Sequence, residues 1–325
     1  MLVFHRLFIM ALSGLILVLT LSGCGLATDK PVSVAAHVWP GYELMFLARN
    51  EGELDTKLVN LVETASATES LQALAEGKVD GVALTLDEVL RVRAKGMPLS
   101  VVMIFDVSAG ADVLVARPGI KKLADLKGRR IGYESGALGA LMLAEVLRSG
   151  GLTKKNVQLV SLTIDKQRDA WVSGQVDALV TYEPVSSQLF AQGAVKLFDS
   201  RQIPNTIVDV LAFRSEVLDR SHAAAIRHLL ASHFHALNHL NHNPHDAAYR
   251  MATRLGLQED QVLLAFKGLL LPDAINNRLL LAGSAPPLRD SARRISALMV
   301  EEGLLPHDDS LAALIYADYL PATIR

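Results

Sequence analysis

Histidine is the residue type in this chain whose spacing most directly suggests chemistry. Seven of the ten histidines fall between His222 and His245, in a stretch with helical periodicity. Pairs four residues apart on a helix can chelate a metal ion. Four of the histidines would share one helical face: His228, His235, His239 and His242. We find no carboxylate or cysteine that would complete a compact ligand set, so we expect a hydrated surface face and no metal site.

Catalytic signatures are absent from the sequence. It contains no nucleophile elbow, no Walker loop and no HExxH motif. We therefore expect neither an enzyme nor a cofactor. The net charge of −2 provides no basic excess for nucleic acid or for an electrostatic contact with a membrane surface.

The only cysteine, Cys24, has no partner for an internal disulfide. It follows an almost wholly apolar run over residues 7–20, which is the layout of an export signal. The stretch Leu21-Ser22-Gly23-Cys24 resembles a bacterial lipobox, which implies a signal peptide over residues 1–23 and a lipid on the cysteine thiol. We prefer this interpretation to a catalytic thiol, a metal ligand or a core residue.

The lipobox resemblance predicts where the protein resides. Residues 24–30 would form the lipidated cysteine and a short tether. The chain would be exported to the cell envelope, facing the periplasm or the exterior, and held at a membrane by its lipid anchor only. Without disulfides the fold must depend on a hydrophobic core, for which a 325-residue chain that is 50% hydrophobic is sufficient.

The elements that would position functional side chains are short apolar strands alternating with helices. This alternation predicts βαβ units and mostly parallel sheets. We expect strands over residues 32–39, 57–63, 79–85, 99–105, 112–119, 129–134, 156–162, 176–182, 194–198 and 208–213. We expect helices over residues 41–52, 66–77, 87–96, 137–151, 166–174 and 184–193, and a largely helical region after Ser215.

A short internal sequence similarity suggests two lobes of similar build. Residues 73–85 and 170–182 share alanine, glycine, valine and aspartate at matching positions, and in each a helix ends at glycine before a strand begins. We therefore expect one lobe over residues 31–107, a second over 108–207, and a return to the first lobe with C-terminal helices over 208–325. Two crossings between lobes would make a hinge beside a cleft.

Several stretches resemble the periplasmic solute-binding proteins of ABC importers. They are VWPGYE (38–43), EGKVDGVALT (76–85), RPGIKKLADLKGRRIGYESGALGALMLAEVL (117–147) and VTYEPV (180–185). The similarity is to the nitrate/sulfonate/taurine (NMT1/THI5-like) type. It implies an α/β, two-lobed type II periplasmic-binding-protein fold, in which each lobe has a mostly parallel sheet flanked by helices and the C-terminal region is helical. It also implies a monomer whose partners are a small-molecule ligand and an ABC permease with its ATPase.

Candidate ligand contacts lie where the expected strands end and the following helices begin. The carboxyl ends of strands and the free N–H groups of helix starts are where open α/β sheets bind ligands. In the first lobe the candidates are Trp39, Tyr42, Ser66, Thr68, Thr85, Asp106 and Ser108. In the second lobe they are Glu134, Ser135, Gly136, Tyr182 and Glu183.

The acidic candidates indicate the charge of the ligand. Asp106, Glu134 and Glu183 could all face the cleft, and we find no lysine or arginine at an equivalent position. Buried carboxylates without partners are costly, so we expect an amine- or heterocycle-bearing ligand whose anionic end, if it has one, meets the helix N-termini. Whether these carboxylates line the cleft depends on strand register.

Two other functions compete with transport. Closure of the two lobes on a ligand could instead signal to a membrane partner, and a lipid tether would also suit that function. An enzyme on this scaffold would need a nucleophile or a metal site, and the cysteine-rich motif of the pyrimidine-forming fungal relatives has no counterpart here.

Overall fold

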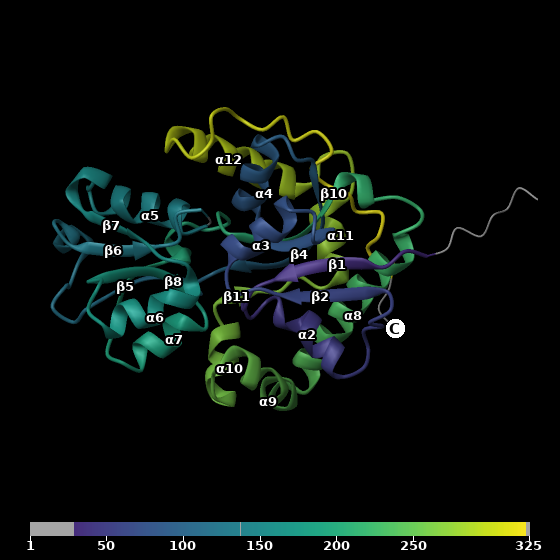
Figure 1. Cartoon of the computed structure of the whole chain (residues 1–325), viewed down its shortest axis with the longest axis horizontal. Helices are drawn as coiled ribbons and strands as arrows, with labels where there is room; N and C mark the ends of the chain where they lie inside the picture. Colours follow the sequence, from purple (N-terminus) through teal and green to yellow (C-terminus); the bar gives the residue numbers. More distant parts are fainter. Residues whose placement is uncertain (1–28, 137, 323–325) are drawn as a thin grey trace, which may run out of the picture.

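The computed structural model describes residues 29–136 and 138–322, which form two α/β lobes (Figure 1). Cys24 and the expected signal peptide lie outside the described residues. Among the helices of the described ranges, none is both long enough and apolar enough to span a bilayer.

The first lobe is built on a six-stranded sheet in the order β11-β4-β10-β3-β1-β2. The strands are β1 (Val32–Ala36), β2 (Val59–Glu63), β3 (Gly81–Thr85), β4 (Leu99–Ser108), β10 (Val208–Arg214) and β11 (Leu269–Leu270). β1 pairs in parallel with β2 and β3, whereas β10 runs antiparallel to β3 and β4. Figure 1 shows α3 (Ala67–Ala75) and α4 (Leu86–Ala94) on one side of this sheet, and α2 (Glu43–Asn50) on the other.

The second lobe contains a five-stranded sheet in the order β7-β6-β8-β5-β9. Its strands are β5 (Asp112–Ala116), β6 (Arg130–Tyr133), β7 (Gln158–Ser161), β8 (Ala178–Tyr182) and β9 (Val195–Asp199). Its helices are α5 (Leu138–Ser149), α6 (Ile164–Val172) and α7 (Val185–Phe190). Short 3-10 turns lie at Leu123–Leu126, Lys154–Asn156, Ser200–Gln202 and Ser215–Val217.

The chain passes between the lobes twice. It leaves β4 at Ser108 and enters β5 at Asp112, and it returns from β9 to β10 over residues 200–207. The strands beside these crossings run against their neighbours, since β5 is antiparallel to β8 and β9. Both sheets are therefore mixed. The α/β class and the two lobes are confirmed, and the antiparallel pairings come from β10 and β11 in the first sheet and from β5 in the second.

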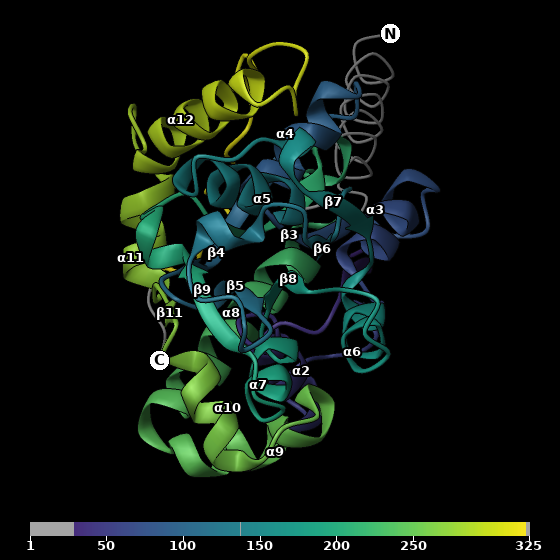
Figure 2. The ribbon, with the colours of Figure 1, turned by 90° about the vertical axis from the view of Figure 1, so that its left-hand side faces the viewer.

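The C-terminal region is helical, as the sequence predicts. It forms α8 (Ala223–His242), α9 (Pro244–Leu255), α10 (Glu259–Phe266), α11 (Ala274–Leu281) and α12 (Pro287–Glu301). α2, α8 and α9 pack against one another in both views (Figure 1, Figure 2). The last described stretch returns to the first sheet, where Ile315 pairs with Val101.

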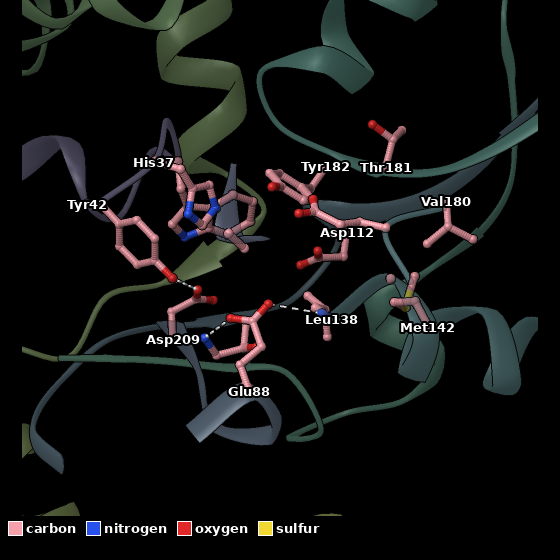
Figure 3. Close-up of a pocket in the computed structure, with 15 residues that line it drawn as sticks. His37, Tyr42, Glu88, Asp112, Leu138, Met142, Val180, Thr181, Tyr182 and Asp209 are labelled. Atoms are coloured by element: carbon pink, nitrogen blue, oxygen red, sulfur yellow. Dashed lines mark hydrogen bonds between the residues drawn. The ribbon is translucent and has the colours of Figure 1, made fainter. Parts of the chain in front are cut away.

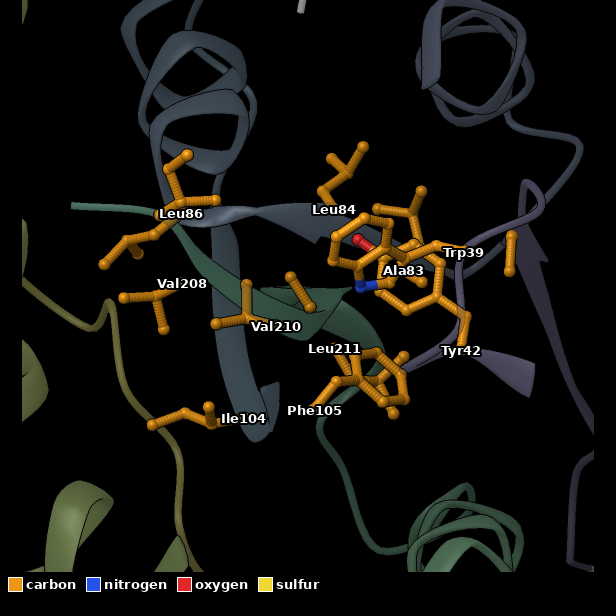
Figure 4. Packing of buried hydrophobic residues seen from close by; sticks show 14 of the residues in the cluster. Trp39, Tyr42, Ala83, Leu84, Leu86, Ile104, Phe105, Val208, Val210 and Leu211 are labelled. Carbon is orange, nitrogen blue, oxygen red and sulfur yellow. The ribbon is translucent and has the colours of Figure 1, made fainter. Parts of the chain in front are cut away.

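A hydrophobic core below the strand ends holds the site residues in place. Trp39, Tyr42 and Phe105 are buried together with aliphatic side chains of β3 and β10 (Figure 4). The Tyr42 and Phe105 rings have centroids 4.9 Å apart. Because this packing fixes the Tyr42 ring, its hydroxyl keeps a fixed position at the edge of the core.

Candidate functional site

A narrow cavity lies between the lobes, at the ends of strands from both sheets (Figure 3). The first lobe supplies His37, Trp39, Tyr42, Thr85, Glu88 and Asp209 to its wall. The second lobe supplies Asp112, Glu134, Leu138, Val180, Thr181 and Tyr182. The centre of a water molecule can occupy about 20 Å³ of the cavity, so a larger molecule can enter only if the lobes separate.

Aromatic side chains form one wall of the cavity. Tyr182 of the second lobe meets Trp39 edge-on, with ring centroids 5.6 Å apart and an interplanar angle of 81°. His37 lies between Tyr42 and Tyr182, and the centroid of its ring is 5.3 Å from that of Tyr42 and 5.8 Å from that of Tyr182. Burial lowers the pKa of His37 to about 3. This imidazole is therefore neutral at physiological pH and presents a hydrogen-bonding nitrogen rather than a charge.

Two aspartates on neighbouring strands lie behind the aromatic wall. Asp106 of β4 and Asp209 of β10 are register partners and are both buried. The Trp39 indole donates to Asp106 Oδ2 at 3.0 Å, and the Tyr42 hydroxyl donates to Asp209 Oδ1 at 2.5 Å. The aspartate pair thus orients the two rings that line the cavity.

Gly41 allows the chain to turn tightly in front of Asp106. A Cβ on Gly41 would overlap the Asp106 carboxylate and would lie 3.1 Å from the Trp39 indole nitrogen. The sequence Trp39-Pro40-Gly41-Tyr42 can therefore place both rings beside the aspartates only with glycine at its third position.

Each lobe supplies a carboxylate to the start of a helix in the other lobe. Glu88 of α4 accepts from the backbone N–H of Leu138, the first residue of α5, at 3.0 Å (Figure 3). Glu134 accepts from the backbone N–H of Thr68, at the start of α3, at 3.0 Å, and from the Thr68 hydroxyl. These helix starts lack intrahelical partners and favour anions. The protein's own carboxylates occupy the positions where we expect the anionic end of a ligand.

Several buried polar atoms of the cavity wall have no hydrogen-bond partner within the described ranges. They are Nδ1 of His37, Oδ2 of Asp112, Oγ1 of Thr181, the hydroxyl of Tyr182 and Oδ2 of Asp209. No lysine or arginine is among the described residues that line the cavity. Because unpaired buried polar groups are costly, the wall is complementary to a polar molecule. The oxygens of Asp112 and Asp209 accept hydrogen bonds when ionised, whereas the hydroxyls of Thr181 and Tyr182 can donate or accept.

The acidic groups of the wall hold their protons more tightly than usual. Burial raises the pKa of Glu88 to about 8, with repulsion from Asp87 adding to the effect. Burial likewise raises the pKa of Asp106 to about 8 and that of Asp112 to about 7. It also raises the pKa values of Glu134 and Asp209. A positive charge among these groups would favour their ionised forms.

The structure brings together some of the expected site residues. Trp39, Tyr42, Thr85, Glu134 and Tyr182 line the cavity. Thr68 and Asp106 do not line it, but they hydrogen-bond to residues that do.

The other expected residues lie off the cavity and have different contacts. Ser66 caps α3 by accepting from the N–H of Glu69, and Ser108 hydrogen-bonds to Ser200 near the chain crossing. Glu183 accepts from the N–H of Ser187 in α7. The two remaining residues, Ser135 and Gly136, also lie outside the wall; Ser135 pairs with Ser161.

Sequence reasoning missed His37, Glu88, Asp112 and Asp209. The signal for Asp112 is its antiparallel pairing with Tyr182, and the signal for Asp209 is its pairing with Asp106 and Thr85. Neither pairing can be read from a single strand. Glu88 stands three residues after Thr85, as a helix-capping acid does, and its contact with the other lobe arises only in the tertiary structure.

The histidine-rich helix also differs from the expectation. His239 lies 2.6 Å from Glu51 and 3.0 Å from Asp246. The expectation that no carboxylate accompanies the histidines is therefore wrong, because α2 and α9 each bring one to α8. His233 points away from this face and is buried against Phe105 and Phe234.

The chain is similar to known proteins in both sequence and fold. A family model described as NMT1/THI5 like matches residues 55–247. A provisionally named aliphatic sulfonates-binding protein of Escherichia coli (strain K12) is 27% identical over 194 residues, which cover 58% of this chain and 60% of that protein. A provisionally named thiamine biosynthesis protein of Haemophilus influenzae is 28% identical over 147 residues, which cover 44% of this chain and 46% of that protein.

A solved structure of similar fold is the alkanesulfonate-binding protein SsuA from Xanthomonas axonopodis pv. citri bound to MOPS. The TM-score is 0.74 at 18% identity, covering 89% of this chain and 99% of that one. At this identity the likeness concerns the fold. The chain matches less than two thirds of the length of both curated relatives.

Proposed function

Because this chain belongs to the NMT1/THI5-like family, we propose that it binds an amine- or heterocycle-bearing organic ligand between its lobes and delivers it to an ABC permease. Its relatives support a solute-binding role in an extracytoplasmic compartment. The ligand class, the delivery to a permease and the lipid anchor are parts of the proposal.

The observation that carries the ligand class is the set of unpartnered acceptors in the cavity wall. Oδ2 of Asp112 and Oδ2 of Asp209 are buried and can only accept hydrogen bonds when ionised. A protonated amine or a ring N–H supplies the donors they need. The rings of Trp39 and Tyr182 add faces or edges against which a cation or a flat heterocycle can pack.

The helix starts argue against a simple anion as ligand. A sulfonate or nitrate would need free N–H groups or a cationic side chain. The N–H groups of Thr68 and Leu138 already donate to Glu134 and Glu88. The E. coli relative is named for aliphatic sulfonates, so the ligand proposed here differs from that of a family member.

Thermal unfolding of the purified full chain against a panel of small molecules tests the proposal. The panel contains diamines, aminopyrimidines, alkyl sulfonates and nitrate. A ligand at about 100 times its Kd adds about 2.7 kcal/mol to the free energy of unfolding, which is a shift of a few degrees. We expect this shift with an amine or an aminopyrimidine, and we expect Asp112→Asn to reduce it.

Asp169→Asn is the matched control, because Asp169 is an exposed acid of the same lobe. A shift with sulfonate or nitrate alone would refute the ligand class but keep the solute-binding role. Mass spectrometry of the released ligand tests the absence of catalysis, since a binding protein returns the ligand unchanged.

The proposed lipid anchor rests on the sequence around Cys24. We expect the full chain to sediment with membranes and Cys24→Ser to appear in the soluble fraction. Co-purification of the wild-type protein with permease and ATPase subunits supports transport, whereas co-purification with a membrane sensor would support signalling instead.

A further inference from the structure

A histidine at the end of α8 lies between two carboxylates from other elements. His239 Nδ1 is 2.6 Å from Oε1 of Glu51, and His239 Nε2 is 3.0 Å from Oδ2 of Asp246. Glu51 caps the C-terminus of α2, His239 is in the last turn of α8, and Asp246 is in the first turn of α9. Three helices that pack against one another therefore contribute one side chain each (Figure 2).

The donor set suits a divalent transition metal. Glu51, His239 and Asp246 each offer one ligand atom, and these atoms lie within 4.8 Å of one another. One imidazole nitrogen with two carboxylate oxygens is a ligand set used for Zn²⁺, whose bond lengths imply ligand atoms about 3.4 Å apart in a tetrahedron. Glu51 is nearest Nδ1 and Asp246 is nearest Nε2, so a metal bound to one ring nitrogen requires one carboxylate to move toward it. The Asp246 side chain is about half exposed and is free to rotate.

We propose that Glu51, His239 and Asp246 form a zinc-type metal site that links α2 to the α8–α9 corner. Three protein ligands would leave the fourth position to water, as in open zinc sites. The site is separate from the interlobe cavity, since none of its residues lines that cavity. It is also independent of the proposed transport function.

A cation already interacts with this cluster. Arg250 Nε lies 2.6 Å from Asp246 and 3.7 Å from Glu51. Glu51, Asp246 and Arg250 together carry a net charge of −1, to which the imidazole adds a positive charge only when both of its nitrogens are protonated. A divalent ion would compensate both carboxylates more closely than the guanidinium does, and it would have to displace Arg250 to bind.

The neighbouring histidines offer a competing explanation that can be tested. His235 is one turn before His239 and pairs with Glu53 at 3.8 Å, so a His235–His239 chelate would not need Glu51 or Asp246. His242 is exposed on the same helix and its ring meets the Asn238 carbonyl instead of a carboxylate. Substitutions in the two carboxylates and in the two flanking histidines therefore separate the models.

Isothermal titration of ZnCl₂ into the metal-free full chain tests the proposal. We expect one equivalent of zinc to bind, and we expect Glu51→Gln, His239→Gln and Asp246→Asn each to weaken binding at least tenfold. Arg250→Gln should tighten it, because a competing cation is removed. His242→Gln is the matched control and should bind zinc as the wild type does. Far-UV circular dichroism verifies that each variant is folded.

The proposal fails if Glu51→Gln and Asp246→Asn retain wild-type affinity. If His235→Gln weakens binding as much as His239→Gln while both carboxylate variants bind normally, zinc is held by a His235–His239 chelate. Absence of a one-equivalent binding event in the wild type also overturns the proposal.

Discussion

Glu88 of the first lobe accepts a hydrogen bond from the backbone N–H of Leu138 in the second lobe, at 3.0 Å. Glu134 of the second lobe makes the reciprocal contact with Thr68 of the first. The two glutamates thus accept hydrogen bonds from helix N-termini across the cleft. These hydrogen bonds of Glu88 and Glu134 connect the two lobes directly.

Weakening these contacts should favour the open form. In Glu88→Gln and Glu134→Gln one of the two accepting oxygens is replaced by an NH₂ group, which cannot accept a hydrogen bond from the helix N–H groups. We expect a loss of about 1 kcal/mol per contact, or about fivefold in the ratio of open to closed molecules. Small-angle X-ray scattering should show a larger radius of gyration for the double variant. Glu76→Gln, an exposed acid on the first lobe, should not change the radius.

The stability of the protein should decrease between pH 6.5 and 8. Glu88 and Asp106, with pKa values raised to about 8, remain protonated in the folded state where the unfolded chain has lost these protons. The free energy of unfolding then falls as pH rises, by about 1 kcal/mol per pH unit for each protonated carboxyl.

Two buried histidines act in the opposite direction at lower pH. Burial lowers the pKa values of His37 and His233 to about 3, so their effect lies mainly in the range from about 3 to their ordinary value of 6.5. The unfolded imidazoles are still half protonated at pH 6.5 and lose their protons over about one further pH unit, so chemical denaturation at pH 7.5 and 8 isolates the carboxyls. Glu88→Gln should flatten the dependence, and an unchanged slope in that variant would contradict the assignment.

The two tyrosines of the cavity should respond differently to loss of the hydroxyl. Tyr42 donates to Asp209, so Tyr42→Phe should cost about 1–3 kcal/mol by leaving a buried carboxyl without its donor. The Tyr182 hydroxyl has no partner among the described residues. Tyr182→Phe should therefore leave stability almost unchanged and weaken ligand binding. Urea midpoints and ligand-induced thermal shifts measure the two effects, and equal stability losses would argue against this difference.

Gly41→Ala should disturb the aromatic wall. The added methyl group would overlap the Asp106 carboxylate, so Trp39 or Asp106 must move, and we expect a loss of about 1–3 kcal/mol. Gly119→Ala is the control, because nothing lies within 4 Å of a Cβ at that exposed turn. Intrinsic tryptophan fluorescence should change in the first variant only. Identical fluorescence and stability in both variants would show that the close approach at Gly41 is not required.

The sequence predicts the strands and helices of both lobes well, because each has its own local signal. The runs ALVTY of β8 and VDVLAF of β10 are mostly apolar and β-branched or aromatic, as is typical of buried strands. Confirmed helices such as α4 have acidic residues in their first turn, which suits a helix start. The mixed sheets were not predicted because direction depends on the crossings between lobes, which carry no periodic signal.

The site was predictable only where it follows from a strand end. Thr85 and Tyr182 end β3 and β8, so their position at the cavity edge is a local property. Asp112 and Asp209 enter the site through antiparallel partners more than 65 residues away in the sequence. Glu51 reaches His239 through helix packing, and no spacing rule relates residues that distant.

The strands that cross between the lobes also carry three of the acids at the site. Asp106 lies on β4 behind the cavity wall, whereas Asp112 on β5 and Asp209 on β10 line the cavity, so these acids and the crossings share the same backbone. An evolving variant cannot replace these side chains without also altering the segments about which the lobes rotate. Ligand preference and the rate of opening are therefore expected to change together during divergence of the family, and relatives that bind other solutes should differ in both.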